Sequence, residues 1–345
     1  MTESTPRRAG FRMPAEWEPH EATWIAWPHN RDDWPGRFTP IPWVYGEIVR
    51  KLSRVEKVRI LLDGPSQERQ ASGVLRKVGA AMDAVEFFEC PTDRVWTRDY
   101  APLFLRDRRG VVAATKWRFN GWAKYPSHKL DDAAGRYIAK RIGAETWAPE
   151  MVLEGGSVDV NGAGLLLTTE ECLLSDVQAR NPGMTRREIE RNLSDYLGAR
   201  KVIWLRNGID GDDTHGHVDD LARFVGPDTV VVASEDDPAD ANYQPLRENL
   251  ALLKQADLRV VKLPMPRPLV FSGVRLPASY ANFYIANGLV LVPTFNDPAD
   301  RVALATLAKC FPDRTVTGID CTALIWGLGA LHCMTQQQPA VWALT

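Results

Sequence analysis

The stretch NPGMTRREIERNLSDYLGARKVIWLRNG, residues 181–208, contains the unit that decides the fold. Its Asn-Pro-Gly start predicts a turn, and the pattern after it predicts a helix from about Thr185 to Leu197. The apolar run Lys201–Leu205 predicts a strand that ends at Asn207-Gly208. A helix that leads directly into a strand is the building unit of an α/β protein.

The same unit recurs along the chain, which indicates a single α/β domain of repeated modules over residues 11–345. No linker rich in Gly, Ser or Pro divides it, and the polar residues 1–10 are expected to be a disordered tail. The expected helix and strand pairs are 44–52 with 57–62, 67–82 with 84–89, 244–255 with 258–263 and 300–308 with 314–319, with further strands at 111–119, 165–169, 229–233 and 289–293.

Composition excludes several classes of protein. An apolar content of 45% and a charged content of 25% are ordinary for a globular protein in water. The formal net charge of -2 disfavours nucleic acid as a partner, because phosphate binding needs a basic excess. No apolar run is long enough to span a bilayer and no signal peptide is visible, so we expect a cytoplasmic location. The five cysteines form no C-x-x-C pair, so a zinc ribbon is unsupported.

The segment GLGALHCMTQQQ, residues 327–338, places a lone cysteine beside a histidine. Its two glycines permit a tight turn or the close approach of a ligand. Cys333 is then a candidate nucleophile, since the thiolate is the reactive form of cysteine. The alternative is a small buried core residue, which is the usual role of a free cysteine.

Two further segments place acids beside aromatic or small residues. In WTRDYAP, residues 96–102, Asp99 is a candidate ligand of a cation and Trp96 a candidate wall of the pocket; a structural Arg-Asp pair is the alternative. Glu154 precedes Gly155-Gly156, which suggests a close approach of the backbone to a ligand or to another strand.

The segment GDDTHGHVDDLARFV, residues 211–225, holds two histidines and four acids within nine positions. If residues 217–225 form a strand, His217 and Asp219 point to the same face. They then suit an acid/base and an anchoring carboxylate. His215, His217 and the nearby aspartates also resemble a metal site, and a solvated acidic loop fits residues 210–213.

Two other segments supply polar groups near turns. Asn287-Gly288 predicts a hairpin within residues 279–295, where Asn282 is either a pocket group or a strand residue satisfied by backbone. Residues 11–42 are rich in tryptophan and proline and are expected to be irregular, with acids beside aromatics around Trp17 and Glu18.

Taken together, these motifs resemble those of the agmatine deiminase and bacterial-type peptidylarginine deiminase family. The resemblance rests on Trp96-Thr-Arg-Asp99, Glu154-Gly-Gly, Gly-His217-Val-Asp219, the Asn282 segment and His332-Cys333-Met-Thr-Gln-Gln-Gln-Pro339. The opening MPAEWEPH, residues 13–20, is also similar to the start of that family. The motifs occur in the family's order, so the resemblance covers nearly the whole chain.

The resemblance implies a pentein fold (an α/β propeller), with about five αβ modules around a pseudo-fivefold axis and a central active site. By motif position, Cys333 would be the nucleophile and His217 the general acid/base. Asp99 and Asp219 would hold a guanidinium group, with Glu154 beside His217. No cofactor and no metal are implied.

The implied reaction is hydrolysis of agmatine to N-carbamoylputrescine and ammonia, with a small guanidino compound as the only partner; a homodimer is left open. Glu18, with Trp17 beside it, would then meet the distal amine of agmatine. The segment 327–331 reads Gly-Leu-Gly-Ala-Leu where the family usually has three glycines and an asparagine, and His215 replaces a more usual acid or small residue. These departures leave the substrate open between agmatine, peptidyl arginine and other guanidino compounds. An amidinotransferase, a metal hydrolase and a non-catalytic guanidino-binding protein are the competing functions.

Overall fold

A computed structural model describes residues 5–341 of the chain. They form five sheets of three or four strands, the helices between these strands and one separate two-stranded sheet. In each of the five larger sheets two strands pair antiparallel, and a helix then leads to a third strand that pairs parallel with the second. A helix between parallel strands is the ordinary crossover of an α/β unit. Each of these five sheets is therefore one module, as the repeated units of the sequence predict.

Four modules follow this plan without addition. The first consists of β4 (Leu103–Arg106), β5 (Val112–Thr115), α4 (Lys129–Arg141) and β6 (Glu145–Trp147), and the second of β7 (Asp159–Val160), β8 (Leu165–Thr169), α5 (Glu170–Leu174), α6 (Arg186–Leu197) and β9 (Lys201–Leu205). The third consists of β10 (Ala222–Phe224), β11 (Thr229–Ser234), α7 (Tyr243–Gln255) and β12 (Arg259–Pro264). The fourth consists of β15 (Tyr284–Ala286), β16 (Leu289–Thr294), α8 (Ala299–Cys310) and β17 (Thr315–Asp320). A separate hairpin joins β13 (Val270–Phe271) to β14 (Val274–Arg275).

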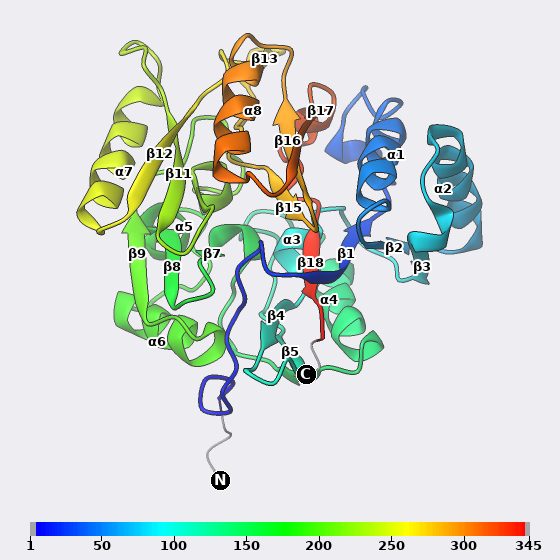
Figure 1. Ribbon diagram of the computed structural model, residues 1–345, viewed down its shortest axis with the longest axis horizontal. Coiled ribbons are helices and arrows are strands. Elements are labelled where there is room, and N and C mark those ends of the chain that lie inside the picture. Colours follow the sequence, from blue (N-terminus) through cyan, green and yellow to red (C-terminus); the bar gives the residue numbers. More distant parts are fainter. Residues whose placement is uncertain (1–4, 342–345) are drawn as a thin grey trace.

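The fifth module joins the two ends of the chain. The C-terminal strand β18 (Gln336–Pro339) pairs antiparallel with β1 (His20–Ala26), and α1 (Ile41–Leu52) leads to the parallel strand β2 (Lys57–Leu62). This sheet has one added strand, β3 (Val85–Glu89), which follows α2 (Pro65–Val78). In Figure 1 the red β18 lies beside the blue β1 near the centre, and α2, α6 and α7 lie toward the periphery. The pairing of β1 with β18 closes the ring of modules.

Local sequence explains why these elements begin and end where they do. The helix α6 begins at a capping box in which Thr185 and Glu188 satisfy each other's backbone N–H groups, and it ends at Gly198, whose φ is 77°. Its buried residues Ile189, Leu193 and Leu197 recur every four positions and form the face that packs on the core. The helix and strand predicted from residues 181–208 are confirmed.

Four expectations about secondary structure are wrong in part. The segment 11–42, expected to be irregular, contains the strand β1, and the strand expected over residues 111–119 is confined to β5. Residues 217–225 do not form one strand, because Val218–Asp220 is a helical turn and only Ala222–Phe224 is extended. Asp212 Oδ2 accepts hydrogen bonds from the backbone N–H groups of Gly216 and His217, which fixes a turn there. The helix expected over residues 67–82 ends at Val78, since Gly79 has a left-handed φ of 77°.

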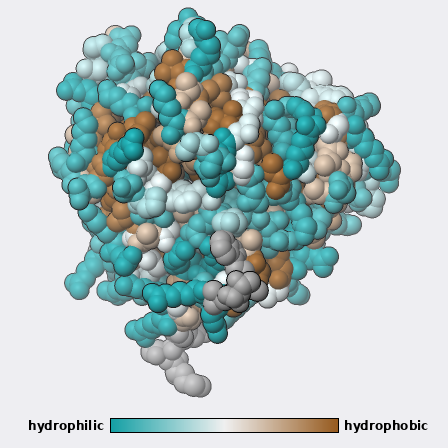
Figure 2. All heavy atoms as spheres, viewed as in Figure 1, coloured by the Kyte–Doolittle hydropathy of each residue, from teal (hydrophilic) through white to brown (hydrophobic). Residues whose placement is uncertain are grey.

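The disordered tail expected over residues 1–10 lies in part outside the described residues, and the single domain over 11–345 stays a prediction. From residue 5 onward the chain makes contacts, including a hydrogen bond from the Arg7 N–H to the Asp195 carbonyl on α6. The face in Figure 2 is largely hydrophilic, with apolar residues in separated patches. No helix within residues 5–341 is long and apolar enough to cross a membrane.

Candidate active site

The segment that leads into the first strand of each module contributes a residue to the centre of the ring. Asp99 lies on α3 (Thr97–Tyr100) before β4, and Glu154 lies before β7. His217 and Asp219 lie before β10, Asn282 before β15 and Cys333 before β18. Five equivalent positions of a repeated fold thus converge, which explains why candidates so far apart in sequence meet.

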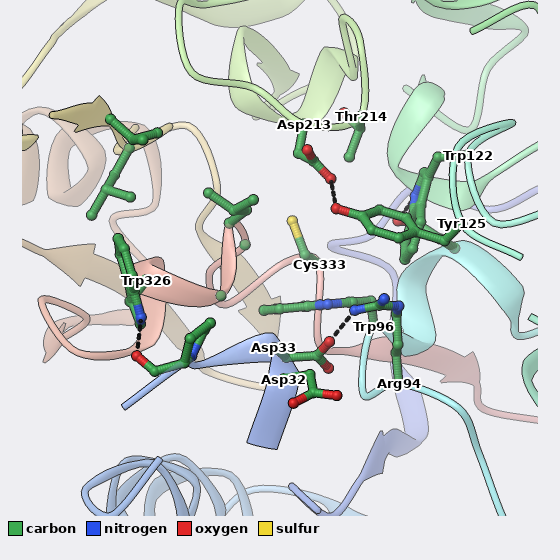
Figure 3. A pocket seen from close by; sticks show the side chains of 17 residues that line it. Asp32, Asp33, Arg94, Trp96, Trp122, Tyr125, Asp213, Thr214, Trp326 and Cys333 are labelled. Atoms are coloured by element: carbon green, nitrogen blue, oxygen red, sulfur yellow. Dashed lines mark hydrogen bonds and ion pairs between the residues drawn. The ribbon is translucent and has the colours of Figure 1, made fainter. Parts of the chain in front are cut away.

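A cavity of about 250 Å³ opens beside Cys333, whose sulfur points into it (Figure 3). Trp96 and Trp122 line it together with Asp99, as expected for Trp96. Gly327 and Gly329 do approach another group closely, as predicted, but that group is a tryptophan ring of the protein itself. A Cβ at Gly327 would lie 2.6 Å from Trp34, and a Cβ at Gly329 would lie 2.6 Å from Trp96.

The Cys333 thiol is buried among polar groups. Its Sγ accepts a hydrogen bond from Asn282 Nδ2 at 3.0 Å and lies 3.9 Å from Asp219 Oδ2. Burial raises the pKa of Cys333 well above its usual value, and the nearby carboxylates Asp219, Asp220 and Asp99 raise it further. Asn282 therefore contacts the candidate nucleophile and does not line the cavity itself.

His217 lies between two carboxylates. Its Nδ1 is 3.8 Å from Asp99 Oδ1, and its Nε2 is 3.7 Å from Glu154 Oε2. Burial lowers the pKa of His217, but the charge of Asp99 and the contacts with Cys172 and Glu154 outweigh this and raise it well above the usual value. The imidazolium form is thus favoured, which suits a group that gives a proton to a leaving amine.

Arg180 holds the glutamate of this pair, with its Nε 3.1 Å from Glu154 Oε1. Burial raises the pKa of Glu154, but Arg180 and His217 lower it to about 2. The sequence analysis missed Arg180, because the neighbouring residues 181–183 were interpreted only as a helix start. The available signal was an arginine directly before the Asn-Pro-Gly turn.

Asp99 is oriented by two donors. Its Oδ1 accepts from the Gly156 N–H at 3.0 Å, and its Oδ2 accepts from Trp122 Nε1 at 2.9 Å. Burial raises its pKa to about 6, although the attraction of His217 opposes this. A cation in the cavity would lower that pKa and hold the carboxylate in its charged form.

Gly156 lies where His217, Asp99 and Asp219 meet. A Cβ at this position would be 2.5 Å from His217 Nδ1, 2.9 Å from Asp99 Oδ1 and 3.0 Å from Asp219 Oδ2. The close approach expected at Glu154-Gly155-Gly156 is therefore present and is made by the side chains of the site.

Gly156→Ala is accordingly expected to lower kcat/KM by about 100-fold, since a displacement of about 1 Å in such a site has that effect. Ammonia release measures the rate, and thermal melting checks the fold. Gly73→Ala on α2 is the matched control, because a Cβ there meets nothing within 4 Å. Equal rates for the two variants would remove Gly156 from the site.

Asp219 is held by a network that the sequence analysis missed. Its Oδ2 accepts from His332 Nδ1 at 2.6 Å, and His332 Nε2 lies 2.7 Å from Glu16 Oε2. Arg223 pairs with Glu16 at 3.0 Å. Burial raises the pKa of Asp219, but the hydrogen bond and charge of His332 lower it below the usual value. Asp219 Oδ1 is buried and has no hydrogen-bond partner among the described residues, and Asp219 does not itself line the cavity.

Trp17 and Glu18 are not brought together with the other candidates. Glu18 pairs with Arg12 at 2.7 Å and also with Arg106, and the Trp17 carbonyl accepts from Arg314 at 2.7 Å. Neither Trp17 nor Glu18 lines the cavity. Their placement at the distal amine is therefore withdrawn; local ion pairs account for Glu18.

His215 lies apart from His217 and Asp219, contrary to the metal-site interpretation. Its Nε2 is 3.2 Å from Ser175 Oγ, and its Nδ1 is 3.8 Å from Glu171 Oε1. The groups of metal-ligating side chains found within residues 5–341 do not include it. The structure thus does not bring together the three ligands of a hydrolase of that type.

The five-module ring with its central site defines a pentein, the class of α/β enzymes that modify guanidino groups. Residues 12–339 match the family of Porphyromonas-type peptidyl-arginine deiminases. The chain is 36% identical to an agmatine deiminase of Pseudomonas aeruginosa (strain LESB58), over 98% of both chains.

Solved structures of agmatine deiminases are similar to this chain over nearly their whole length. The agmatine deiminase of Enterococcus faecalis superposes with a TM-score of 0.90 at 31% identity, covering 98% of both chains. A cysteine-to-serine variant of C. jejuni agmatine deiminase with substrate bound superposes with a TM-score of 0.88 at 31% identity, covering 97% of both chains.

The chain belongs to this family of agmatine deiminases and Porphyromonas-type peptidyl-arginine deiminases, and it is a hydrolase that acts on C–N bonds of amidines. The resemblance and the fold drawn from the sequence are thereby confirmed. The roles of individual residues, a cytoplasmic location and a homodimer stay predictions.

Proposed function

We propose that the protein hydrolyses agmatine to N-carbamoylputrescine and ammonia through a covalent adduct on Cys333. The observation that carries this proposal is that the Cys333 thiol and the Asp99 carboxylate line a cavity, while two buried groups lie against them: Asp219 Oδ2 is 3.9 Å from the Cys333 sulfur and His217 Nδ1 is 3.8 Å from Asp99 Oδ1. Carboxylates match the planar fork of a guanidinium, and a thiolate attacks its carbon.

In this mechanism Asp99 and Asp219 bind the guanidinium and the Cys333 thiolate attacks its carbon, forming a tetrahedral adduct. The His217 imidazolium gives a proton to one nitrogen, which leaves as ammonia, so that an alkylated amidino-thioether remains on Cys333. Neutral His217 then takes a proton from water as the water adds to the same carbon. Collapse of this second adduct breaks the C–S bond and releases the ureido product.

Arrival of the substrate explains how a thiol with a raised pKa becomes reactive. Three carboxylates raise the pKa of Cys333 in the free site, where Asp219, Asp220 and Asp99 have no cationic substrate to neutralise them. A guanidinium among them offsets their charge and favours the thiolate, with the thiol proton lost to solvent. The thiolate therefore forms when the substrate is in place.

The charges of the cavity favour agmatine over arginine. Four carboxylates line it, those of Asp32, Asp33, Asp99 and Asp213, of which Asp213 also pairs with Lys124. Arg94 is the basic residue of the lining, but it pairs with Asp33 and stacks on Tyr125 with its guanidinium carbon 4.2 Å from the ring centroid (Figure 3). A second amine suits this lining, whereas the carboxylate of arginine would meet like charges.

We therefore expect kcat/KM for agmatine to exceed that for arginine by at least about 100-fold, because juxtaposed like charges cost several kcal/mol. Ammonia release from agmatine, arginine and an arginyl peptide, measured in parallel, tests this. Asp213→Asn should narrow the ratio between agmatine and arginine. Asp236→Asn is the control, since that side chain is 96% exposed and outside the cavity. A preference for arginine or the peptide would refute agmatine as the substrate.

A further inference from the structure

A second buried thiol lies beside His217. Glu154, Cys172 and His217 each offer one ligand atom, and these atoms lie within 4.8 Å of one another. Their exposed fractions are 0%, 1% and 1%. Carboxylate oxygen, thiolate sulfur and imidazole nitrogen are the three donor types that Zn²⁺ takes in proteins. The mechanism proposed above gives Cys172 no role.

The nitrogen and oxygen atoms of this cluster make no hydrogen bond of ordinary length to one another, although Cys172 and Glu154 both raise the pKa of His217. Glu154 Oε2 and both ring nitrogens of His217 are buried without a hydrogen-bond partner among the described residues. Nε2 and Oε2 face each other across 3.7 Å, which is too long for a hydrogen bond. Ligand atoms on one tetrahedral zinc ion lie roughly 3 to 4 Å apart, so little movement would admit the ion.

We propose that Glu154, Cys172 and His217 form an inhibitory Zn²⁺ site within the active centre. The Cys172 thiol loses its proton as the Zn–S bond forms, and the imidazolium of His217 loses one as the Zn–N bond forms. One Zn²⁺ replaces two protons, so the net charge of the buried cluster is unchanged. Arg180 already holds the other oxygen of Glu154 at 3.1 Å, which fixes the carboxylate for this role.

Zinc at this site would stop turnover, because the imidazole nitrogen that it binds no longer carries a proton. A competing cluster exists at Asp219, Asp220 and Cys333. It is the weaker candidate, since it offers no imidazole nitrogen and its sulfur already accepts a hydrogen bond from Asn282 Nδ2 at 3.0 Å. The two clusters use different thiols, so their cysteine variants distinguish them.

Co²⁺ is the probe, because a thiolate bound to cobalt gives a charge-transfer absorption band. We expect Cys333→Ala protein to bind one Co²⁺ with this band and to release it when Zn²⁺ is added. In the double variant Cys333→Ala/Cys172→Ala, the band should be absent and Zn²⁺ should bind more than about tenfold more weakly than to Cys333→Ala protein. Adding Cys310→Ser instead is the matched control, since Cys310 is a half-buried thiol outside both clusters, and the band should remain.

The proposal would be overturned if the band persisted in the double variant Cys333→Ala/Cys172→Ala, or if Cys333→Ala protein showed no band. Glu154→Gln provides a second test if Cys172→Ala does not fold, with the same loss of zinc affinity expected. The affinity should also fall as the pH is lowered, because protons compete for the thiol and the imidazole. These measurements report metal binding and not turnover, so they test the zinc site even if the protein does not hydrolyse agmatine.

Discussion

Cys333→Ser is expected to lower the turnover of agmatine by a factor on the order of 1,000 or more while the protein still folds and binds agmatine. An alcohol is far less ionised than a thiol at neutral pH, and a guanidinium carbon is a poor electrophile. Serine is close in size to cysteine, so Asn282 Nδ2, which donates to Sγ at 3.0 Å, keeps an acceptor. Loss of rate without loss of binding therefore isolates the chemistry.

Ammonia release measures the rate, and isothermal titration with agmatine measures the binding. Cys310→Ser is the control, because it makes the same change at a half-buried thiol away from the cavity. More than a few per cent of residual turnover in Cys333→Ser would exclude the covalent mechanism. Full activity in the presence of chelators is expected as well, since no step of the mechanism uses a metal.

Asp99→Asn should weaken the binding of agmatine by roughly 2 to 5 kcal/mol, the effect of removing one partner from a buried charge pair. The substitution keeps the shape but removes the charge. Its amide also gains an N–H that must face either Trp122 Nε1–H or the Gly156 N–H, both of which donate to Asp99. The measurement is isothermal titration of agmatine in the Cys333→Ser background.

Asp220→Asn is the matched control inside the same site. Burial raises the pKa of Asp220 well above its usual value, and the neighbouring Asp219 raises it further. The charged form of this carboxyl group is therefore disfavoured, and asparagine is expected to change the charge at this position less than at Asp99. A small change in affinity is expected for Asp220→Asn. Equal affinities for the Asp99 and Asp220 variants would show that the guanidinium binds elsewhere.

The repeated units of the fold could be predicted from the sequence because each carries its own signals. The capping residues of α6 and the Asn287-Gly288 turn between β15 and β16 are local, so they are visible without the rest of the chain. The pairing of β1 with β18 depends on residues more than 300 positions apart. Only the resemblance to a family pointed to the ring that this pairing closes.

The candidate site was predictable where its residues lie in recognisable motifs. Cys333, His217, Asp219, Asp99 and Glu154 were found in this way, and they do come together. The roles of the supporting groups carry no local signal: His332 lies in the Cys333 motif, but its partners Asp219 and Glu16 come from distant parts of the chain. Glu18 was misplaced because a carboxylate beside a tryptophan looks the same whether it faces a ligand or, as here, the arginines Arg12 and Arg106.

The most direct test of the proposed deimination is the mass of the peptide that contains Cys333 after acid quenching during agmatine turnover. Loss of ammonia leaves the whole alkylated amidino group on sulfur, so the peptide should gain the mass of agmatine less ammonia. An amidinotransferase would instead release the amine and leave only the bare amidino group. Unmodified Cys333 under full turnover, or a gain of the bare amidino group, would contradict the account.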